Sequence, residues 1–147
     1  MLPCALEELY LCENKIGDVG IRGLVLPDSL RTLRLTDNIF GSNGVQGLRL
    51  PSKLEYLNIG GNYIGDEGVK QLVLPDGLLE LNLHENNISS EGLRQLDFPR
   101  GLQILDLSHN MIGIGGTKHI VFAPTLRTLN IGGNCIGDAG ILKLIFP

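Results

Sequence analysis

The fold is decided by one short stretch, Leu54-Glu55-Tyr56-Leu57-Asn58-Ile59-Gly60-Gly61-Asn62-Tyr63-Ile64. In its pattern, LxxLxLxxNxI, the central LxL places two side chains on one face and the residue between them on the other, which predicts a short strand. The asparagine follows the strand, and the isoleucine two residues later returns the chain to the core. We therefore expect the turn after the strand to be buried and fixed.

The same pattern recurs along the chain with a period of 24 residues. Its asparagines follow one another at this spacing without insertion or deletion, at Asn14, Asn38, Asn62, Asn86, Asn110 and Asn134. A period of about 20 to 50 residues identifies a repeat architecture. The spacing therefore predicts six strands in one domain, residues 1–147, built from six 24-residue units.

The second half of each unit predicts a short helix, as in residues 65–72. Near its start stands a residue suited to a helix N-cap, at Asp18, Ser42, Asp66, Ser90 and Asp138. A glycine two residues later, present in all six units, is expected to press against the sheet. An apolar residue and a proline, such as Leu74-Pro75, then end the helical path.

The fifth unit departs from this pattern. Pro124 falls one residue later than the prolines of the other units, Ala123 takes their place, and Ile114 occupies the N-cap position. We therefore expect the fifth helix to be the least stable of the six.

Neither end of the chain carries a polar segment that would cover the apolar core of a terminal unit. Phe146-Pro147 is similar to the opening of a seventh unit. We expect the chain to be a fragment of a longer array, or its terminal units to associate end to end with other copies.

Composition and charge argue against several classes of partner. The formal charge is −4 and no basic run is present, which disfavours nucleic acid. No apolar stretch approaches the roughly 20 residues that span a bilayer. Three cysteines, Cys4, Cys12 and Cys135, give no even disulfide framework, and no secretory signal precedes them. We expect a soluble cytoplasmic protein that binds neither nucleic acid nor membranes.

Six copies of LxxLxLxxNxI resemble the leucine-rich repeats, and the continuation NxIGDxG is similar to their ribonuclease-inhibitor-like branch. The resemblance covers the entire chain. It implies an α/β fold, a curved horseshoe with a parallel sheet on its concave face and short helices on its convex face. It also implies that the six asparagines form a ladder whose amides satisfy turn backbone between units. The opening LPxxLxxL resembles the repeats of bacterial effectors delivered into host cells, although the helical half departs from that family's shorter unit.

The strand residues that point away from the core are the candidate binding site. With strands about 4.8 Å apart, six strands span about 24 Å, which suits a protein or peptide partner. Tyr10, Arg34 and Tyr56 are the preferred anchors, and acids outnumber arginines around them, so we expect a partner with a basic patch. The predicted protein-binding residues are Glu8, Tyr10, Arg34, Tyr56, Asn58, Glu80, Asn82, His84, Asp106, Thr128 and Asn130.

Three alternatives stay open. Surface strand positions also vary freely when nothing binds them. Asp106, Ser108 and His109 suggest a catalytic triad, and His84, His109 and Glu80 suggest a metal site, but the strand geometry places His109 in a turn and offers no enclosing pocket. We therefore predict a non-catalytic protein-interaction scaffold without cofactor or metal. An effector module that binds a host protein in the host cytosol is the second hypothesis, and an enzyme is the last.

Overall fold

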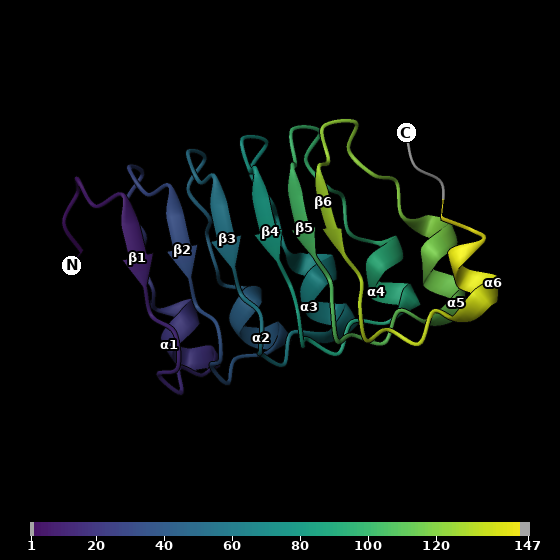
Figure 1. Cartoon of the computed structure of the whole chain (residues 1–147). Helices are drawn as coiled ribbons and strands as arrows, with labels where there is room; N and C mark the ends of the chain where they lie inside the picture. The colour runs from purple at the N-terminus through teal and green to yellow at the C-terminus, as the bar shows by residue number, and fades with distance from the viewer. Residues whose placement is uncertain (1, 145–147) are drawn as a thin grey trace.

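The structure, a computed structural model, describes residues 2–144 as a solenoid of two layers (Figure 1). The residues expected to open a seventh unit, Phe146-Pro147, lie outside this range. Strands form one layer and helices the other. The strands are β1 (Glu8–Tyr10), β2 (Thr32–Arg34), β3 (Tyr56–Asn58), β4 (Glu80–Asn82), β5 (Ile104–Asp106) and β6 (Thr128–Asn130). The helices are α1 (Asp18–Arg22), α2 (Ser42–Val45), α3 (Gly65–Gln71), α4 (Ser90–Arg94), α5 (Gly113–Gly116), the 3₁₀ turn η1 (Thr117–His119) and α6 (Gly137–Ile141).

The six strands form one parallel sheet whose order follows the sequence, β1-β2-β3-β4-β5-β6. Neighbouring strands pair with a constant offset of 24 residues, as in the pairs Leu33 with Leu57 and Leu57 with Leu81. Parallel strands lie about 4.8 Å apart, whereas packed helices need about 8–10 Å. The helix layer is therefore the longer one, and the sheet lies on the inner, concave side. The predicted α/β solenoid is confirmed.

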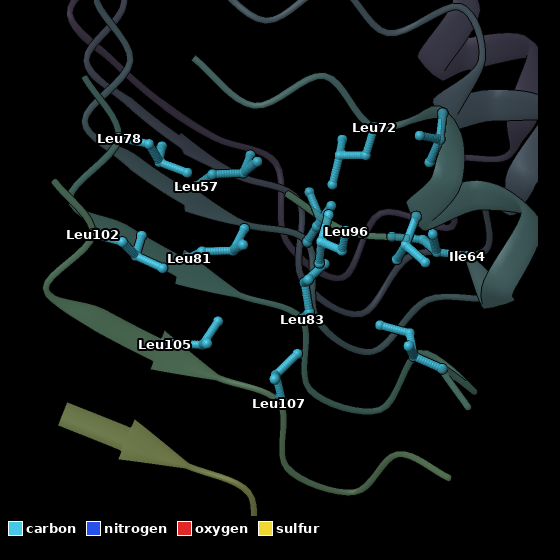
Figure 2. Close-up of a cluster of buried hydrophobic side chains, with 14 of the residues drawn as sticks. Leu57, Ile64, Leu72, Leu78, Leu81, Leu83, Leu96, Leu102, Leu105 and Leu107 are labelled. Atoms are coloured by element: carbon cyan, nitrogen blue, oxygen red, sulfur yellow. The ribbon is translucent and has the colours of Figure 1, made fainter. Parts of the chain in front are cut away.

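The core is a stack of aliphatic layers between the sheet and the helices. Figure 2 shows Leu57, Leu81 and Leu105 above one another from three consecutive strands, with Leu72 and Leu96 facing them from the helical side. Each fully buried leucine contributes about 1.5–3 kcal/mol relative to an exposed one. Many small contacts therefore replace the few large anchors of an ordinary globular core.

The asparagines lie in the turns that follow the strands and connect each unit to the one before it. Asn110 shows the full pattern: its Oδ1 accepts from the backbone N–H groups of Asn86 and Ile88, both at 3.0 Å. Its Nδ2 donates to the carbonyls of Leu83 at 2.9 Å and Leu107 at 3.0 Å. A buried backbone group needs a partner, so one amide side chain satisfies the turns of two units. Asn14 has no unit before it among the described residues and is exposed.

The recurring glycines do not press against the sheet, and that expectation was wrong. They lie where one helix approaches the preceding helix. A Cβ added to Gly92 would lie 2.9 Å from the Cα of Asp66, and one added to Gly68 would lie 3.3 Å from the Cα of Ser42. The glycines therefore let successive helix backbones come close together, which shortens the outer layer and limits the curvature of the solenoid.

The residues expected to be helix N-caps do not cap their own helices. No side-chain hydrogen bond to the first backbone N–H groups of its own helix is made by Asp18, Ser42, Asp66, Ser90 or Asp138.

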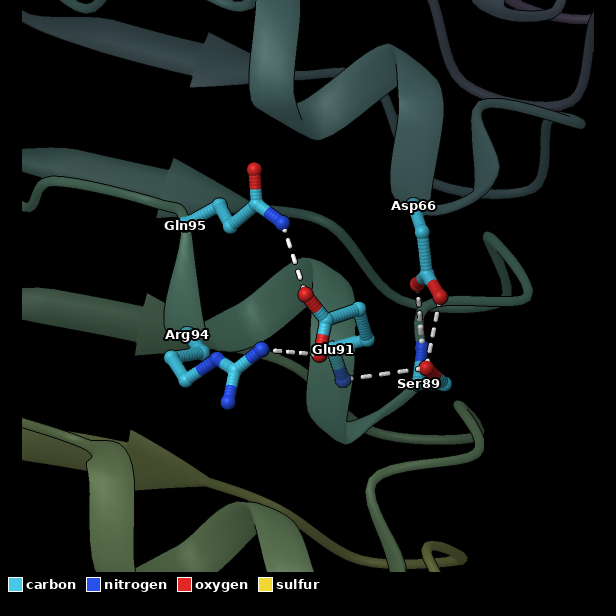
Figure 3. A network of polar contacts seen from close by, with 5 residues as sticks. All are labelled: Asp66, Ser89, Glu91, Arg94 and Gln95. Carbon is cyan, nitrogen blue, oxygen red and sulfur yellow. Dashed lines mark hydrogen bonds and ion pairs between the residues drawn. The ribbon is translucent and has the colours of Figure 1, made fainter.

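Two of these residues bond forward into the next unit instead. The Oδ1 of Asp18 accepts from the N–H of Gly41 at 2.7 Å, and the Oδ1 of Asp66 accepts from the N–H of Ser89 at 2.7 Å. Figure 3 shows the second case, in which the Oγ of Ser89 also donates to Asp66 at 2.6 Å and accepts from the N–H of Glu91 at 3.1 Å. Side chains in the first helical turn thus point along the stack, where the next unit offers backbone N–H groups.

The irregular fifth unit keeps the common turn before its strand. The N–H of Leu126 donates to the carbonyl of Ala123 at 3.0 Å, as the N–H of Leu102 does to that of Pro99 at 3.1 Å. Its helix α5 has only four residues and continues directly into the 3₁₀ turn η1. The lower stability expected for this helix stays a prediction.

We predict that Asn110→Ala lowers the free energy of unfolding by about 2–4 kcal/mol, because it leaves buried backbone donors and acceptors of two units without partners. Asn14→Ala removes only the 2.8 Å bond to the carbonyl of Cys12, so its effect should be below about 0.5 kcal/mol. Urea unfolding followed by circular dichroism measures both. Equal effects of the two variants would contradict the role of the ladder.

A second pair of variants tests the helix contacts. Gly92→Ala should destabilise the chain by about 1–3 kcal/mol because its Cβ meets backbone of the preceding helix. Gly115→Ala should stabilise it by up to about 1 kcal/mol, because its Cβ would find the nearest heavy atom only at 3.7 Å and alanine favours the helix. Thermal unfolding of the two variants beside the native chain decides the point, and stabilisation by Gly92→Ala would refute it.

Candidate functional site

The outward side chains of the sheet form three straight rows, because every strand pair has the same register. We name each row by its first residue: the Glu8 row, the Tyr10 row and the Cys12 row. The predicted binding residues all lie on these rows. The Glu8 row carries Glu8, Tyr56, Glu80 and Thr128; the Tyr10 row carries Tyr10, Arg34, Asn58, Asn82, Asp106 and Asn130; His84 lies on the Cys12 row.

Four residues of the Tyr10 row hold the turn that follows their own strand. In each, a side-chain oxygen accepts from the backbone N–H two residues later, at 2.8 to 3.1 Å. Asn and Asp favour this local bond. The residues are Asn58, Asn82, Asp106 and Asn130. Their recurrence in four consecutive units is the signal of this local role in the sequence, whereas the sequence analysis predicts these residues as protein-binding.

Tyr10 and Arg34, the first two residues of the Tyr10 row, do not bond to the turn after their strand. Together with Glu8 they form a cluster. The guanidinium carbon of Arg34 lies 5.5 Å from the centre of the Tyr10 ring, within the reach of a cation–π contact. The Tyr10 hydroxyl donates to the Glu8 carboxylate at 2.8 Å, and this bond raises the pKa of Tyr10 above its ordinary value. The Tyr10 side chain is nevertheless 54 % exposed. An oriented aromatic ring and two opposite charges thus stand at one end of the face.

The Glu8 row is partly exposed. Tyr56, the third preferred anchor, is 39 % exposed and pairs in register with Thr32 and Glu80. Beside it, Glu55 forms an ion pair with Arg31. Because this pair neutralises one arginine, the acids Glu8 and Glu80 keep the balance of the face negative.

Asp106 is the centre of a hydrogen-bond network in the second half of the face. Its carboxylate accepts from the Ser108 hydroxyl at 2.6 Å, from the Ser108 N–H at 2.8 Å and from the Asn130 amide at 3.0 Å. Partial burial alone would raise its pKa, but the bonds from Ser108 and Asn130 and the nearby His84 together hold the pKa of Asp106 below the ordinary value. Asp106 is therefore a stable carboxylate near neutral pH.

These contacts do not build a catalytic relay. Ser108 donates to Asp106, while His84 Nδ1 lies 2.8 Å from the Asn82 Oδ1. Within residues 2–144, no hydrogen bond links Ser108 to His84 or His109, so no imidazole is placed to activate the hydroxyl. In the same part of the chain, no group of three His, Cys, Asp or Glu side chains is arranged to hold a metal ion.

A cavity of about 550 Å³ lies outside the rows, between the loops that precede β5 and β6. Phe98, Phe122 and Val121 supply much of its apolar lining. No row residue lines it, so it is not part of the candidate face. No helix of the described chain is both long and apolar enough to cross a membrane.

We predict that Asp106→Asn destabilises the chain at pH 7 by less than about 1 kcal/mol, because solvent still screens this half-buried carboxylate. The pKa of Asp106 is lowered by folding, so its contribution is present above the pKa of the unfolded chain, about 3.9. It is lost as the pH falls through the lower folded pKa. The difference between native and variant in urea unfolding should therefore vanish near pH 2. A difference of the same size at both pH values would contradict this assignment.

A match to a protein family agrees with the geometry. A family model described as Leucine Rich repeat matches residues 4–25, 51–73, 78–96 and 122–144, more than half of the chain. No curated protein matches it significantly. Among solved structures, the plant peptide hormone receptor RGFR1 in complex with RGF2 matches with 22 % identity and a TM-score of 0.41, over 79 % of this chain and 22 % of the receptor chain. On the strength of the family model and of six units in one register, the chain belongs to the leucine-rich-repeat family.

Proposed function

We propose that this chain is a non-catalytic scaffold that binds a partner protein through the concave face of its sheet. Membership of the leucine-rich-repeat family supports the proposal, because the curvature of solenoids creates the extended concave surfaces that such proteins use for binding. The three rows supply a surface about 24 Å long. This length suits a folded partner or an extended peptide better than a small molecule.

The observation that carries the proposal is the cluster of Glu8, Tyr10 and Arg34. Tyr10 and Arg34 occupy equivalent positions in the first two units. The four later units carry Asn or Asp at this position, and the side-chain oxygen bonds to the turn after the strand. Local structure therefore does not explain why tyrosine and arginine stand here. Both residue types are enriched among those that dominate binding energies, and the contact between them orients both side chains before a partner arrives.

The charge of the face defines the partner further. Glu8 and Glu80 lie on the Glu8 row and Asp106 on the Tyr10 row, whereas Arg31 is already paired with Glu55. An acidic surface accelerates the association of a basic partner, and salt screens this effect. We therefore propose a partner with a basic docking surface. Within that surface, an acidic or amide group contacts Arg34.

We also propose that the protein works in a reducing compartment such as the cytoplasm. Cys4 and Cys135 are exposed and Cys12 is half-exposed, and all three are free thiols. Exposed free thiols persist where the cell keeps them reduced.

The proposal predicts that a photo-crosslinking amino acid placed at Ile104 or Thr128, on the concave rows, captures a partner, whereas one at Lys70 on the helix α3 does not. For the partner so identified, Tyr10→Ala combined with Arg34→Ala should weaken binding by about 30-fold or more, as expected for the loss of interface anchors worth about 2 kcal/mol or more. Calorimetry with purified proteins measures this change.

Arg22→Ala combined with Lys70→Ala removes two charges from the helical side and is the matched control. It should leave the affinity unchanged. Capture from Lys70 alone, or equal losses in both double variants, would overturn the concave site.

A further inference from the structure

A second surface lies where the chain enters the strands, at the end of the sheet away from the ladder asparagines. We call it the loop edge. It consists of the apolar residue and proline that close each unit and the residues on either side of them. Cavities lie along it between the closes of neighbouring units, with about 450 Å³ between the second and third and about 550 Å³ between the fourth and fifth. These two cavities differ in their walls, and the difference points to a ligand for the larger one.

The walls of the larger cavity are aromatic. Phe98 and Phe122 line it from the closes of the fourth and fifth units. The three earlier units have leucine at this position, and it packs against the core there, at Leu26, Leu50 and Leu74. The solenoid therefore does not require a ring. A hollow lined by apolar and aromatic side chains and a few polar groups is typical of a ligand site, for which volumes of about 300–1,000 Å³ are usual.

Arg100 lines the same cavity from the residue after the proline. The earlier units have Asp28, Ser52 and Asp76 at this position, residue types that suit a turn. The turn itself is the same with arginine, because the N–H of Leu102 donates to the carbonyl of Pro99 at 3.1 Å, as in the earlier units. Local structure therefore does not explain Arg100, whose guanidinium forms no ion pair within residues 2–144.

The charges of the lining favour an anionic ligand. Arg94 and Arg100 outnumber Asp97, the one acid among the described residues that line the cavity. Because Arg94 is paired with Glu91, Arg100 is the cation that remains for a ligand. The cavity between the second and third units has Asp76 and, among its described lining residues, no basic one. An acidic ligand would therefore discriminate between the two cavities.

The shape of the hollow favours a peptide segment over a compact small molecule. An adjoining cavity of about 430 Å³ shares Asp97, Phe98 and Arg100 with the larger one, so the hollow continues along the edge. The Thr125 hydroxyl donates to the carbonyls of Arg100 at 2.9 Å and Leu102 at 2.8 Å, which holds the two loops together before a ligand arrives. Asp97 offers an acceptor to the backbone N–H groups that a peptide carries.

We infer that the loop edge between the fourth and fifth units is a second binding site, which takes an aromatic side chain and an adjacent acidic residue from a segment of a partner protein. The aromatic ring lies between Phe98 and Phe122, because contacts between aromatic rings add to the free energy of area burial. The acidic residue binds the Arg100 guanidinium through charge-assisted hydrogen bonds. The inference does not depend on the concave rows.

The test uses the peptide acetyl-Gly-Glu-Phe-Glu-Gly-amide and its neutral counterpart with glutamine in place of both glutamates. In NMR titrations of the isotope-labelled chain, the acidic peptide should shift the amide signals of Phe98, Val121 and Phe122 saturably, with a dissociation constant in the roughly millimolar range expected of so small a ligand. The neutral peptide should bind about 3- to 10-fold more weakly. Arg100→Gln should cause the same loss for the acidic peptide and none for the neutral one, because the lost contact is the same.

Val121→Glu should weaken binding of the acidic peptide at least about tenfold, because it places a repelling charge in the wall of the cavity. Val73→Glu is the matched control. Val73 occupies the equivalent position of the third unit, lines the 450 Å³ cavity instead and is 82 % exposed, as Val121 is 83 % exposed, so both variants should fold. The control should leave the dissociation constant unchanged.

Tyr10→Ala combined with Arg34→Ala should also retain peptide binding, so failure of the concave site and failure of this site are distinguishable. Equal binding of the acidic and neutral peptides, equal losses in the Val121 and Val73 variants, or shifts confined to the concave rows would each overturn the inference. A peptide with glycine in place of phenylalanine should not bind measurably, and undiminished binding of that peptide would refute the aromatic pocket.

Discussion

Each turn of this solenoid depends on hydrogen bonds from the next unit. The asparagine that follows a strand accepts from backbone of the preceding unit and donates to carbonyls of both units, as Asn110 does toward Asn86, Leu83 and Leu107. A unit alone would leave these buried groups without partners, and each such group costs about 1–3 kcal/mol. The 24-residue spacing is therefore constant, because an insertion in one unit would move its turn away from the asparagine that satisfies it.

This constraint also decides which surface residues are available for binding. The side chains of Asn58, Asn82, Asp106 and Asn130 face outward, but their oxygens hold the backbone that leads into the ladder. Tyr10 and Arg34 occupy the same row and make no such bond, while they contact each other instead. The Tyr10 row thus has four residues whose types the fold explains and two, Tyr10 and Arg34, whose types it does not explain. On this row, only Tyr10 and Arg34 inform us about a partner.

The period, the strands and the solenoid could be predicted because they depend on contacts between equivalent positions, which a repeat displays directly. The roles of Asp66 and Gly92 could not. Asp66 bonds to Ser89, and Gly92 accommodates the backbone of Asp66, so each acts on a non-equivalent position in a neighbouring unit. Within one unit, Asp66 has the chemistry of an N-cap and Gly92 that of a helix–sheet contact. For the candidate site, sequence placed the residues on the correct rows but could not separate side chains that bond locally from those that do not.

Backbone conformation adds a local cost to the turn that follows each strand. The residue before each ladder asparagine adopts positive φ, from 48° at Glu85 to 67° at Gly133. Glycine adopts this conformation without strain, as at Gly61, whereas other residues lose about 1–2 kcal/mol. Asp37 and Glu85 therefore cost stability that glycine would not, and neither forms an ion pair in the described part of the chain to offset it. Glu13 and His109 adopt the same conformation at the equivalent positions, so the bonds between units hold this turn in place against its local cost.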